Sequence, residues 1–309
     1  MKNTASQTQE MEQKRIASKK LANTLEPYIW IAPSIILMSI FIIIPIFFVF
    51  RMSVSKITKA GLIKGFIGFE NFEKVLTSAK FALVLKNTVV WTIFVVILST
   101  VLGFILALLL NNEFKGRKIA RAIVVFPWAT TLVIQASVWK FILDVDYGAL
   151  NTLLKSLGII STNVNWTPTP EAYFAWEIAC GIFVTIPFVC FTSLSGLQSI
   201  DASLYEAATV DGANYWQQLF QITVPLVKPS LTVATVLNII YVFNSFPIVW
   251  TITKGDPANR TDTLVTYLYK LAFYNGKQGE AAAVSVIGFT ILLVCASIYM
   301  WSTLKKGDE

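Results

Sequence analysis

The stretch from Asn87 to Leu110, NTVVWTIFVVILSTVLGFILALLL, decides the fold of this chain. It contains no charged side chain, and most of its residues are aliphatic or aromatic. A helix rises 1.5 Å per residue, so about 20 apolar residues cross a hydrocarbon layer of about 30 Å. The sequence therefore predicts a membrane-spanning helix here.

Five further segments have a similar length and composition, at about 28–50, 121–143, 172–195, 229–252 and 281–302. The whole chain has 309 residues, of which 55% are hydrophobic and 14% charged, far more apolar than an average soluble domain. We expect an all-α polytopic membrane protein with six transmembrane helices. They form one domain over 28–303, between a cytoplasmic tail at 1–27 and a second one at 304–309.

The orientation of the chain follows from its basic residues. An even number of spans places both termini on one side. With the N-terminus inside, the inner and the outer segments carry 12 Lys and Arg each, which is a tie. The dense clusters at 14–20 and 115–121 favour the cytoplasm for the termini, because short basic segments stay inside. We expect a multi-pass protein of the cell membrane.

The residue types exclude several functions. The chain has no histidine, which removes the commonest metal ligand and the usual general base. Its cysteines, Cys180, Cys190 and Cys295, lie in apolar segments without metal-site spacing, so we expect them to be buried packing residues. The basic residues flank apolar spans, which indicates membrane contact and no nucleic acid. We expect neither catalysis nor a bound metal or cofactor.

The longest inner connector, 196–228, carries helix signals. Asp201 and Ser203 are good N-cap residues, and Ser203 has capping-box spacing to Glu206. These signals predict a short helix over Ala202–Val210. Asp211-Gly212 then predicts a turn.

A second helix is predicted after this turn, from Ala213 to Thr223. Its apolar and aromatic residues recur every three or four positions, and Pro225 follows. We expect an amphipathic helix that ends before this proline. The connector is thus predicted to be a helix-turn-helix at the cytoplasmic face.

This connector resembles the EAA loop of binding-protein-dependent ABC importer permeases. The resemblance rests on the following residues: Glu206, Ala207, Ala208, Gly212, Ile222 and Pro225. Where the family has Leu before the proline, this chain has Val224, which is also apolar. The resemblance implies that the loop is a coupling helix that docks on a cytoplasmic ATPase. An amphipathic helix in the lipid headgroup layer is the alternative.

Other stretches are similar to the carbohydrate branch of that family, the MalF-like and UgpA-like sugar permeases. They include Gly68-Phe69-Glu70-Asn71-Phe72, Gly255-Asp256-Pro257, Thr263-Leu264-Val265-Thr266-Tyr267 and Gly279-Glu280-Ala281-Ala282-Ala283. The family usually has a second glycine where this chain has Asp256. The resemblance implies import of a sugar, in particular an oligosaccharide; glycerol-phosphate or another polyol is the alternative.

The chain has no phosphate-binding loop of the form Gly-x4-Gly-Lys-Ser/Thr, so it is not expected to hydrolyse ATP itself. The resemblance implies a partner ATPase dimer that uses ATP and Mg, a second permease subunit that completes the pore, and an extracellular solute-binding protein. A self-sufficient secondary transporter and a membrane enzyme are the rival classes. Both leave the EAA-like loop unexplained.

Sugar sites combine aromatic faces with amide or hydroxyl groups. Candidates on the third, fourth and fifth spans are Trp128, Thr131, Gln135, Thr185, Phe188, Asn238, Tyr241 and Ser245. The spacing places Trp128, Thr131 and Gln135 on one helical face, and Asn238, Tyr241 and Ser245 on another. Interhelical packing is the alternative for each. Lys140 and Glu177, the ionisable residues within spans, are expected to form an ion pair or to reach the headgroups.

Overall fold

The computed structural model describes residues 28, 30–58 and 60–304, with side chains up to Trp301. The predicted tail at 1–27 lies outside the described residues, as does the predicted tail at 304–309 except for Leu304, which ends the last helix. Contacts divide the chain into two compact units, Met1–Met52 and Ser53–Glu309. We describe each unit separately.

The first unit contains an apolar helix, Trp30–Ser53, with a mean hydropathy of 2.7, of which only the last residue is assigned to the second unit. One turn of it, η1 (Ser39–Ile43), is a π-helix, and α2 (Ile44–Ser53) follows. Pro45 has no N–H to donate, and a wider turn just before it accommodates this missing hydrogen bond. The helix is long enough to cross a membrane, as predicted.

The second unit begins with a hairpin that the sequence did not predict. Strands β1 (Ser55–Ile57) and β2 (Ile63–Phe66) pair antiparallel, with a bulge between Lys56 and Ile57. The short helix α3 (Glu70–Leu76) follows, and the Asn71 amide donates to the carbonyls of Ser53 and Ser55. A buried side chain thus fixes the hairpin to the rest of this unit.

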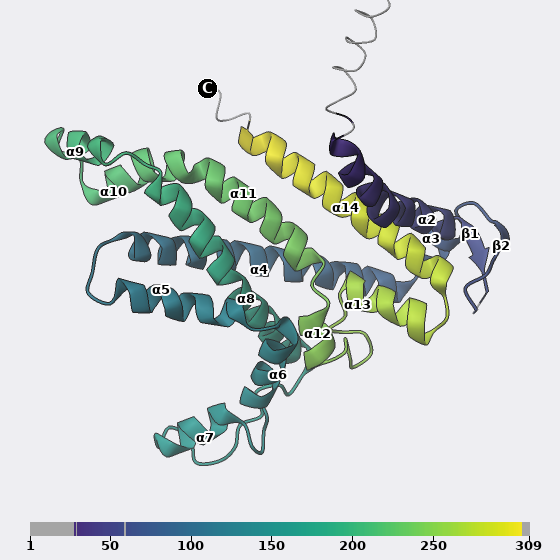
Figure 1. The fold of residues 1–309 in the computed structure, drawn as a ribbon. Helices are drawn as coiled ribbons and strands as arrows, with labels where there is room; N and C mark the ends of the chain where they lie inside the picture. Colours follow the sequence, from purple (N-terminus) through teal and green to yellow (C-terminus); the bar gives the residue numbers. More distant parts are fainter. Residues whose placement is uncertain (1–27, 29, 59, 305–309) are drawn as a thin grey trace, which may run out of the picture. The chain divides into compact units, whose positions relative to one another are not determined.

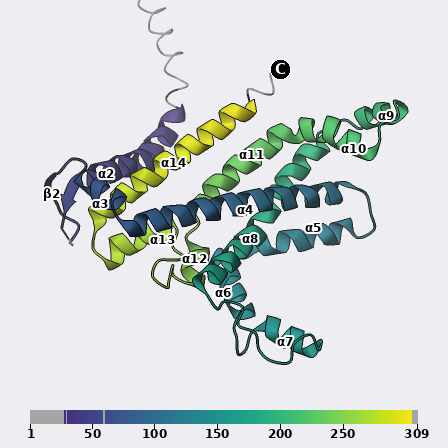
Figure 2. The ribbon, with the colours of Figure 1, turned by 180° about the vertical axis from the view of Figure 1, so that it is seen from behind.

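The core of the second unit is made by long apolar helices, α4 (Ala79–Asn111), α8 (Pro170–Gln198), α11 (Val224–Phe243) and α14 (Gln278–Leu304). Helix α4 packs along α8, and α11 packs against both and against α14 (Figures 1 and 2). Small residues allow this close approach. A Cβ at Gly103 of α4 would lie 2.8 Å from Val189, and one at Gly181 of α8 would lie 2.9 Å from the Trp91 ring.

The third predicted span is a broken one. Helix α5 (Arg117–Val125) continues into the 3-10 turn η2 (Phe126–Ala129), and α6 (Leu132–Ile142) leaves at an angle of 98°. The described residues therefore contain five helices long enough to cross a membrane, or six if this bent pair counts as one. The span predicted at 121–143 is thus bent, because Thr130 and Thr131 adopt extended backbone angles between its two helices.

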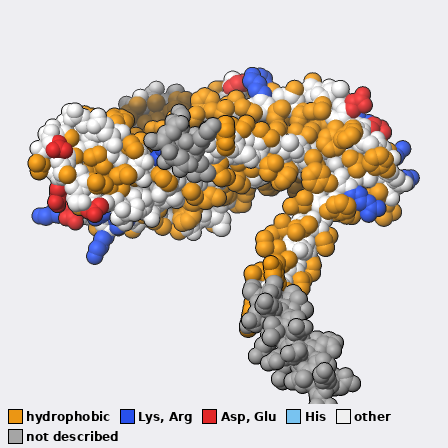
Figure 3. All heavy atoms as spheres, turned by 90° about the horizontal axis from the view of Figure 1, so that it is seen from above, with side chains coloured by type: hydrophobic (Ala, Val, Ile, Leu, Met, Phe, Trp, Pro, Cys, Tyr) orange, Lys and Arg blue, Asp and Glu red, His pale blue; other side chains and the backbone are white. Residues whose placement is uncertain are grey.

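Short elements complete the second unit: α7 (Ala149–Ser156), α9 (Ala202–Val210), α10 (Tyr215–Gln218), the π-turn η3 (Leu219–Thr223), α12 (Pro247–Ile252), α13 (Leu264–Tyr269) and the π-turn η4 (Lys270–Tyr274). Helices α9 and α10 lie at one end of this unit, and α12 and α13 lie toward the other (Figure 1). Hydrophobic side chains cover its middle, and most charged ones lie near its two ends (Figure 3). This distribution fits a body that spans a membrane. Cys180 and Cys190 are buried as predicted, whereas Cys295 is exposed.

Candidate functional site

Helix α9 has the bounds predicted from the sequence, Ala202–Val210. Its N-cap is Asp201, whose carboxylate accepts the Ser203 N–H at 2.9 Å. The hydrogen bonds from the Ser203 N–H and hydroxyl lower the pKa of Asp201. The turn that follows is also confirmed, since Gly212 has φ +77°.

Two side-chain contacts hold α9 against the next helical segment. The Tyr205 hydroxyl lies 2.9 Å from the Thr223 hydroxyl, and the Gln218 amide donates to the Thr209 hydroxyl at 3.1 Å. Tyr205 and Ala208 are the half-buried residues of α9, and its other residues are exposed. Glu206 and Ala207 therefore face away from the chain, on a helix that few contacts restrain.

A polar cavity of about 390 Å³ lies beside α9. It is lined by Ala208, Asp211, Gly212, Ala213, Gln217, Gln218, Gln221 and Ile222. Of the six residues predicted to contact an ATPase, Ala208, Gly212 and Ile222 line this cavity, Glu206 and Ala207 are on the exposed face of α9, and Pro225 is exposed on α11. The loop thus offers both a projecting helix and a hollow beside it.

The second helix of the loop differs from the prediction. It begins at Tyr215, where Asn214 and Gln217 form a capping box, and it continues through η3 into α11. The expectation that it ends before Pro225 is wrong, because the π-turn Leu219–Thr223 widens the helix directly before this proline. The missing N–H of Pro225 falls in the first turn of α11, where helices tolerate it. The loop and the fifth span are therefore one continuous helical element.

A second hollow lies between the long helices. This cavity has a volume of about 260 Å³ and is lined by Trp128, Val184, Thr185, Phe188, Leu237, Asn238 and Tyr241. Five of these residues are predicted substrate residues, from the third, fourth and fifth spans. None of the lining residues carries a charge. We refer to it as the central cavity.

The polar groups of the central cavity are only partly satisfied. The Asn238 amide donates to the Ser99 hydroxyl at 2.8 Å, while its buried carbonyl oxygen has no partner among the described residues. The Thr185 hydroxyl donates to the Gly181 carbonyl of its own helix at 2.9 Å. The rings of Trp128 and Phe188 lie 6.5 Å apart. The central cavity thus combines the rings of Trp128 and Phe188 with the Asn238 carbonyl oxygen, which accepts no hydrogen bond within the described chain.

Thr131 and Gln135 do not line this cavity. Thr131 caps α6 by accepting the Ile134 N–H, and the Gln135 amide donates to the Pro127 carbonyl across the bend. The predicted common face with Trp128 is wrong, because Trp128 belongs to η2 and Gln135 to α6, on opposite sides of the break. These two residues hold the bend.

Ser245 is also outside the cavity. Helix α11 ends at Phe243, so Ser245 lies beyond it and does not continue the face of Asn238 and Tyr241. Its buried hydroxyl has no partner within the described chain. Sequence reasoning missed the apolar lining residues Val184 and Leu237. Val184 directly precedes Thr185, and Leu237 directly precedes Asn238. This proximity to predicted residues is the only indication in the sequence that they line the cavity.

Glu177 and Lys140 do not pair. Lys140 is exposed, whereas Glu177 is fully buried and accepts the Thr253 hydroxyl at 2.6 Å. Thr253 follows α12, so this bond connects α8 to the loop between α12 and α13. The second carboxylate oxygen of Glu177 has no partner in the described part of the chain.

The comparisons with known proteins agree with this geometry. Residues 99–304 match the family of binding-protein-dependent transport system inner membrane components. The chain belongs to this family. The matched range contains both α9 and the central cavity, so the two sites lie in the part of the permease that its relatives share.

Several relatives cover nearly the whole permease. It is 45% identical over 280 residues to a probable ABC transporter permease of Brucella suis, covering 91% of this chain and 97% of that protein. It is 36% identical to the trehalose/maltose transport system permease MalF of Thermococcus litoralis, over 88% of this chain and 92% of MalF.

A solved structure has the same fold. A bacterial ABC transporter that imports the acidic polysaccharide alginate has a chain that superposes with a TM-score of 0.81 at 25% identity, covering 93% of the permease and 98% of that chain. The fold of this permease is thus shared with a solved importer of this transporter class.

Proposed function

We propose that this permease is one of two membrane-spanning subunits of an ATP-driven importer, and that its substrate is a sugar delivered by an extracellular solute-binding protein. The observation that carries the proposal is helix α9, which projects Glu206 and Ala207 from one end of the larger unit. Small side chains let a partner surface approach, and a carboxylate offers a charge-assisted hydrogen bond. A cytoplasmic ATPase dimer, which hydrolyses ATP with Mg, is the partner for this helix.

The orientation follows from this contact. If α9 meets an ATPase, the loop that contains it is cytoplasmic. With six spans, both termini are then cytoplasmic too. The basic connector 115–121 lies on the same side as α9 in this arrangement, in agreement with the positive-inside rule.

The substrate class is supported by the central cavity. Aromatic rings of Trp128, Phe188 and Tyr241 can stack on the C–H faces of a sugar ring, and Asn238 and Thr185 can bond its hydroxyls. None of the described residues that line the cavity is a cation, which a glycerol-phosphate would require for its charge. Relatives include the trehalose/maltose permease MalF. These features favour a neutral sugar, in particular an oligosaccharide.

A second permease subunit is supported by the exposure of the cavity lining. Trp128 is 55% exposed and Tyr241 45% exposed, so one side of the cavity is open. A pathway needs this side closed. A facing homologous subunit would provide the missing wall.

The test uses the complete complex, copurified with the tagged permease and reconstituted in liposomes. We expect sugar-loaded binding protein to stimulate ATP hydrolysis, and Glu206→Lys to abolish this stimulation while the subunit stays inserted. Glu113→Lys is the matched control, because it reverses an exposed acidic residue in another connector predicted to be cytoplasmic. Full stimulation in Glu206→Lys would contradict the docking role of α9.

A further inference from the structure

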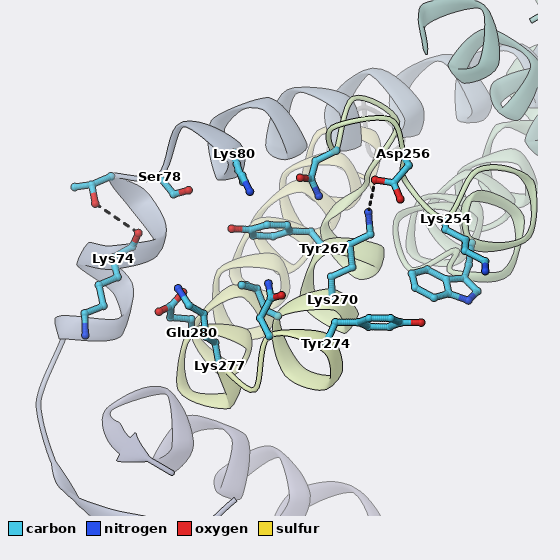
Figure 4. Close-up of a pocket in the computed structure, with 15 residues that line it drawn as sticks. Lys74, Ser78, Lys80, Lys254, Asp256, Tyr267, Lys270, Tyr274, Lys277 and Glu280 are labelled. Carbon is cyan, nitrogen blue, oxygen red and sulfur yellow. Dashed lines mark hydrogen bonds and ion pairs between the residues drawn. The ribbon is translucent and has the colours of Figure 1, made fainter. Parts of the chain in front are cut away.

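A large hollow of the second unit lies at the end opposite α9. It has a volume of about 940 Å³ and is formed by α3, the start of α4, the loop after α12, α13, η4 and the start of α14 (Figure 4). Five lysines line it, Lys74, Lys80, Lys254, Lys270 and Lys277, against two acids, Asp256 and Glu280. We refer to it as the basic outer pocket.

Three of these lysines have carboxylate partners. Lys270 pairs with Asp262 at 2.9 Å and with Asp256 at 3.4 Å, Lys277 pairs with Glu280 at 3.1 Å, and Lys74 pairs with Glu70 at 2.6 Å. Lys80 and Lys254 have no ion pair within the described residues. They stand on either side of Lys270 in Figure 4. Two uncompensated cations therefore flank the middle of the pocket.

The wall that carries Lys254 is a tightly held loop. Lys254, Gly255, Ala258 and Asn259 all have positive φ. The Asn87 side chain of α4 donates to the carbonyls of Arg260 at 2.9 Å and Asp262 at 3.2 Å. The hydroxyls of Thr253 and Thr261 lie 2.7 Å apart. The backbone that carries Lys254 is therefore held in place before any partner binds, which lowers the entropy cost of ordering this loop.

The charge of this pocket contrasts with the central cavity. The residues that line the central cavity carry no charge, so the lysines of the outer pocket do not match the solute proposed above. The pocket also has little aliphatic lining, with Leu271 its one aliphatic side chain, so the acyl chains of a lipid would find little apolar surface. Its aromatic residues, Trp250, Tyr267 and Tyr274, are instead of the kind that is enriched in protein interfaces. Carboxylates of a protein partner fit best.

We propose that the basic outer pocket receives an acidic surface loop of the extracellular solute-binding protein, held by Lys80 and Lys254. This proposal rests on the proposed function, which supplies such a partner on this side of the membrane. It adds the docking site on this subunit and the charge of the docking segment. Complementary charges of this kind raise the rate of encounter and fix the orientation of a complex.

The loop also connects this pocket to the pathway helices. Lys254 directly follows Thr253, whose hydroxyl donates to Glu177 of α8. Glu177 lies about two turns before Thr185, which lines the central cavity. The loop that carries Lys254 is thus hydrogen-bonded to a helix that lines the central cavity.

The test is a titration of the reconstituted complex with its copurified, sugar-loaded binding protein, followed as stimulated ATP hydrolysis at low and high salt. In Lys80→Glu/Lys254→Glu, we expect the concentration for half-maximal stimulation to rise by about tenfold or more at low salt, and its salt dependence to weaken. The maximal rate at saturation should stay near that of the wild type. Lys80→Arg/Lys254→Arg should keep wild-type behaviour.

The matched control is Lys155→Glu on α7, an exposed lysine that does not line this pocket and should have no effect. An unchanged half-maximal concentration in the double Glu variant would overturn the proposal, even if that variant lost bound anionic lipid. In that case lipid would be the occupant. If wild-type complex showed no stimulation by the binding protein, the proposed function itself would fail, and the two outcomes are thus distinguishable.

Discussion

The loop around α9 and the loop between α12 and α13 lie at opposite ends of the second unit and are built in opposite ways (Figures 1 and 2). The α9 loop exposes most of its side chains and is held by two side-chain contacts. The outer loop buries Thr261, Asp262 and Thr263 completely or nearly so and is bonded to α4 and α8. The α9 loop is thus available for contact with a partner, whereas buried hydrogen bonds hold the outer loop in one conformation.

A glycine in each loop gives the sharpest test of this difference. Gly212 has φ +77° with nothing near its missing side chain, while Gly255 has φ +80° and a Cβ there would lie 1.6 Å from an Asp262 carboxylate oxygen. Gly212→Ala should lower the free energy of unfolding by about 1–2 kcal/mol, the cost of the left-handed conformation. Gly255→Ala should lower it by about 3–5 kcal/mol, because Asp262 is also displaced. Thermal unfolding of the purified complex measures both, and equal losses would contradict the contrast.

A threonine in each loop gives the next largest difference. Thr253→Val removes the donor to the buried Glu177 carboxylate, which should lower the free energy of unfolding by about 2 kcal/mol. Thr209→Val removes a hydroxyl on an exposed helix, and the loss should be about 0.5 kcal/mol. Thr253→Ser serves as the control, since it retains the hydroxyl. A loss in Thr253→Val no larger than in Thr253→Ser would show that the bond to Glu177 contributes nothing.

The contact that holds α9 should affect coupling more than stability. Tyr205→Phe removes the hydroxyl that lies 2.9 Å from Thr223, at a cost of about 1 kcal/mol or less. Because this contact is one of two that orient α9, we expect the binding-protein-stimulated rate of ATP hydrolysis to fall by severalfold with little change in unfolding temperature. A fall in unfolding temperature with unchanged stimulation would mean that the contact is only structural.

The two loops should also respond to pH in opposite directions. The Ser203 N–H and hydroxyl lower the pKa of Asp201, so its stabilising effect is present above the unfolded pKa of about 3.9 and is lost as pH falls through the lowered folded value. Burial raises the pKa of Asp262, although hydrogen bonds from Asn259 and Lys270 lower it. The stabilising effect of protonated Asp262 is therefore present below the unfolded pKa of about 3.9 and is lost as pH rises through the raised folded value.

Replacing each aspartate by Asn removes its titration and so isolates its small contribution to the pH dependence of stability. As pH rises through these ranges, wild type should gain unfolding temperature relative to Asp201→Asn and lose it relative to Asp262→Asn. A shift in the same direction for both variants would contradict the assigned environments.

The sequence predicted α9 well because its signals are local. Asp201 caps the helix through a bond to Ser203, two residues away, and Gly212 ends it in a conformation that glycine favours. The same applies to the apolar spans, whose length and composition suffice to predict a crossing helix. Asn238 and Tyr241 share a cavity because they are three residues apart on one regular helix.

Features of the structure that depend on more than the local helical pattern could not be predicted from the sequence. The third span bends by 98° where the Gln135 amide donates to the Pro127 carbonyl across two extended residues, and the helical pattern of the sequence does not reveal so large an angle. The face predicted for Ser245 failed because α11 ends at Phe243. The basic outer pocket combines α3, α14 and the loop after α12, and residues so distant in sequence reveal their proximity only in the fold.

The central claim is that α9 is covered by the ATPase. A cysteine placed at Ala207, in a background with the exposed Cys295 replaced by Ser, reports this directly. We expect a maleimide to label it rapidly in the permease alone and slowly once the ATPase subunits are bound, while a cysteine at Glu113 is labelled equally in both. Equal labelling of the Ala207→Cys variant with and without the ATPase would contradict the account.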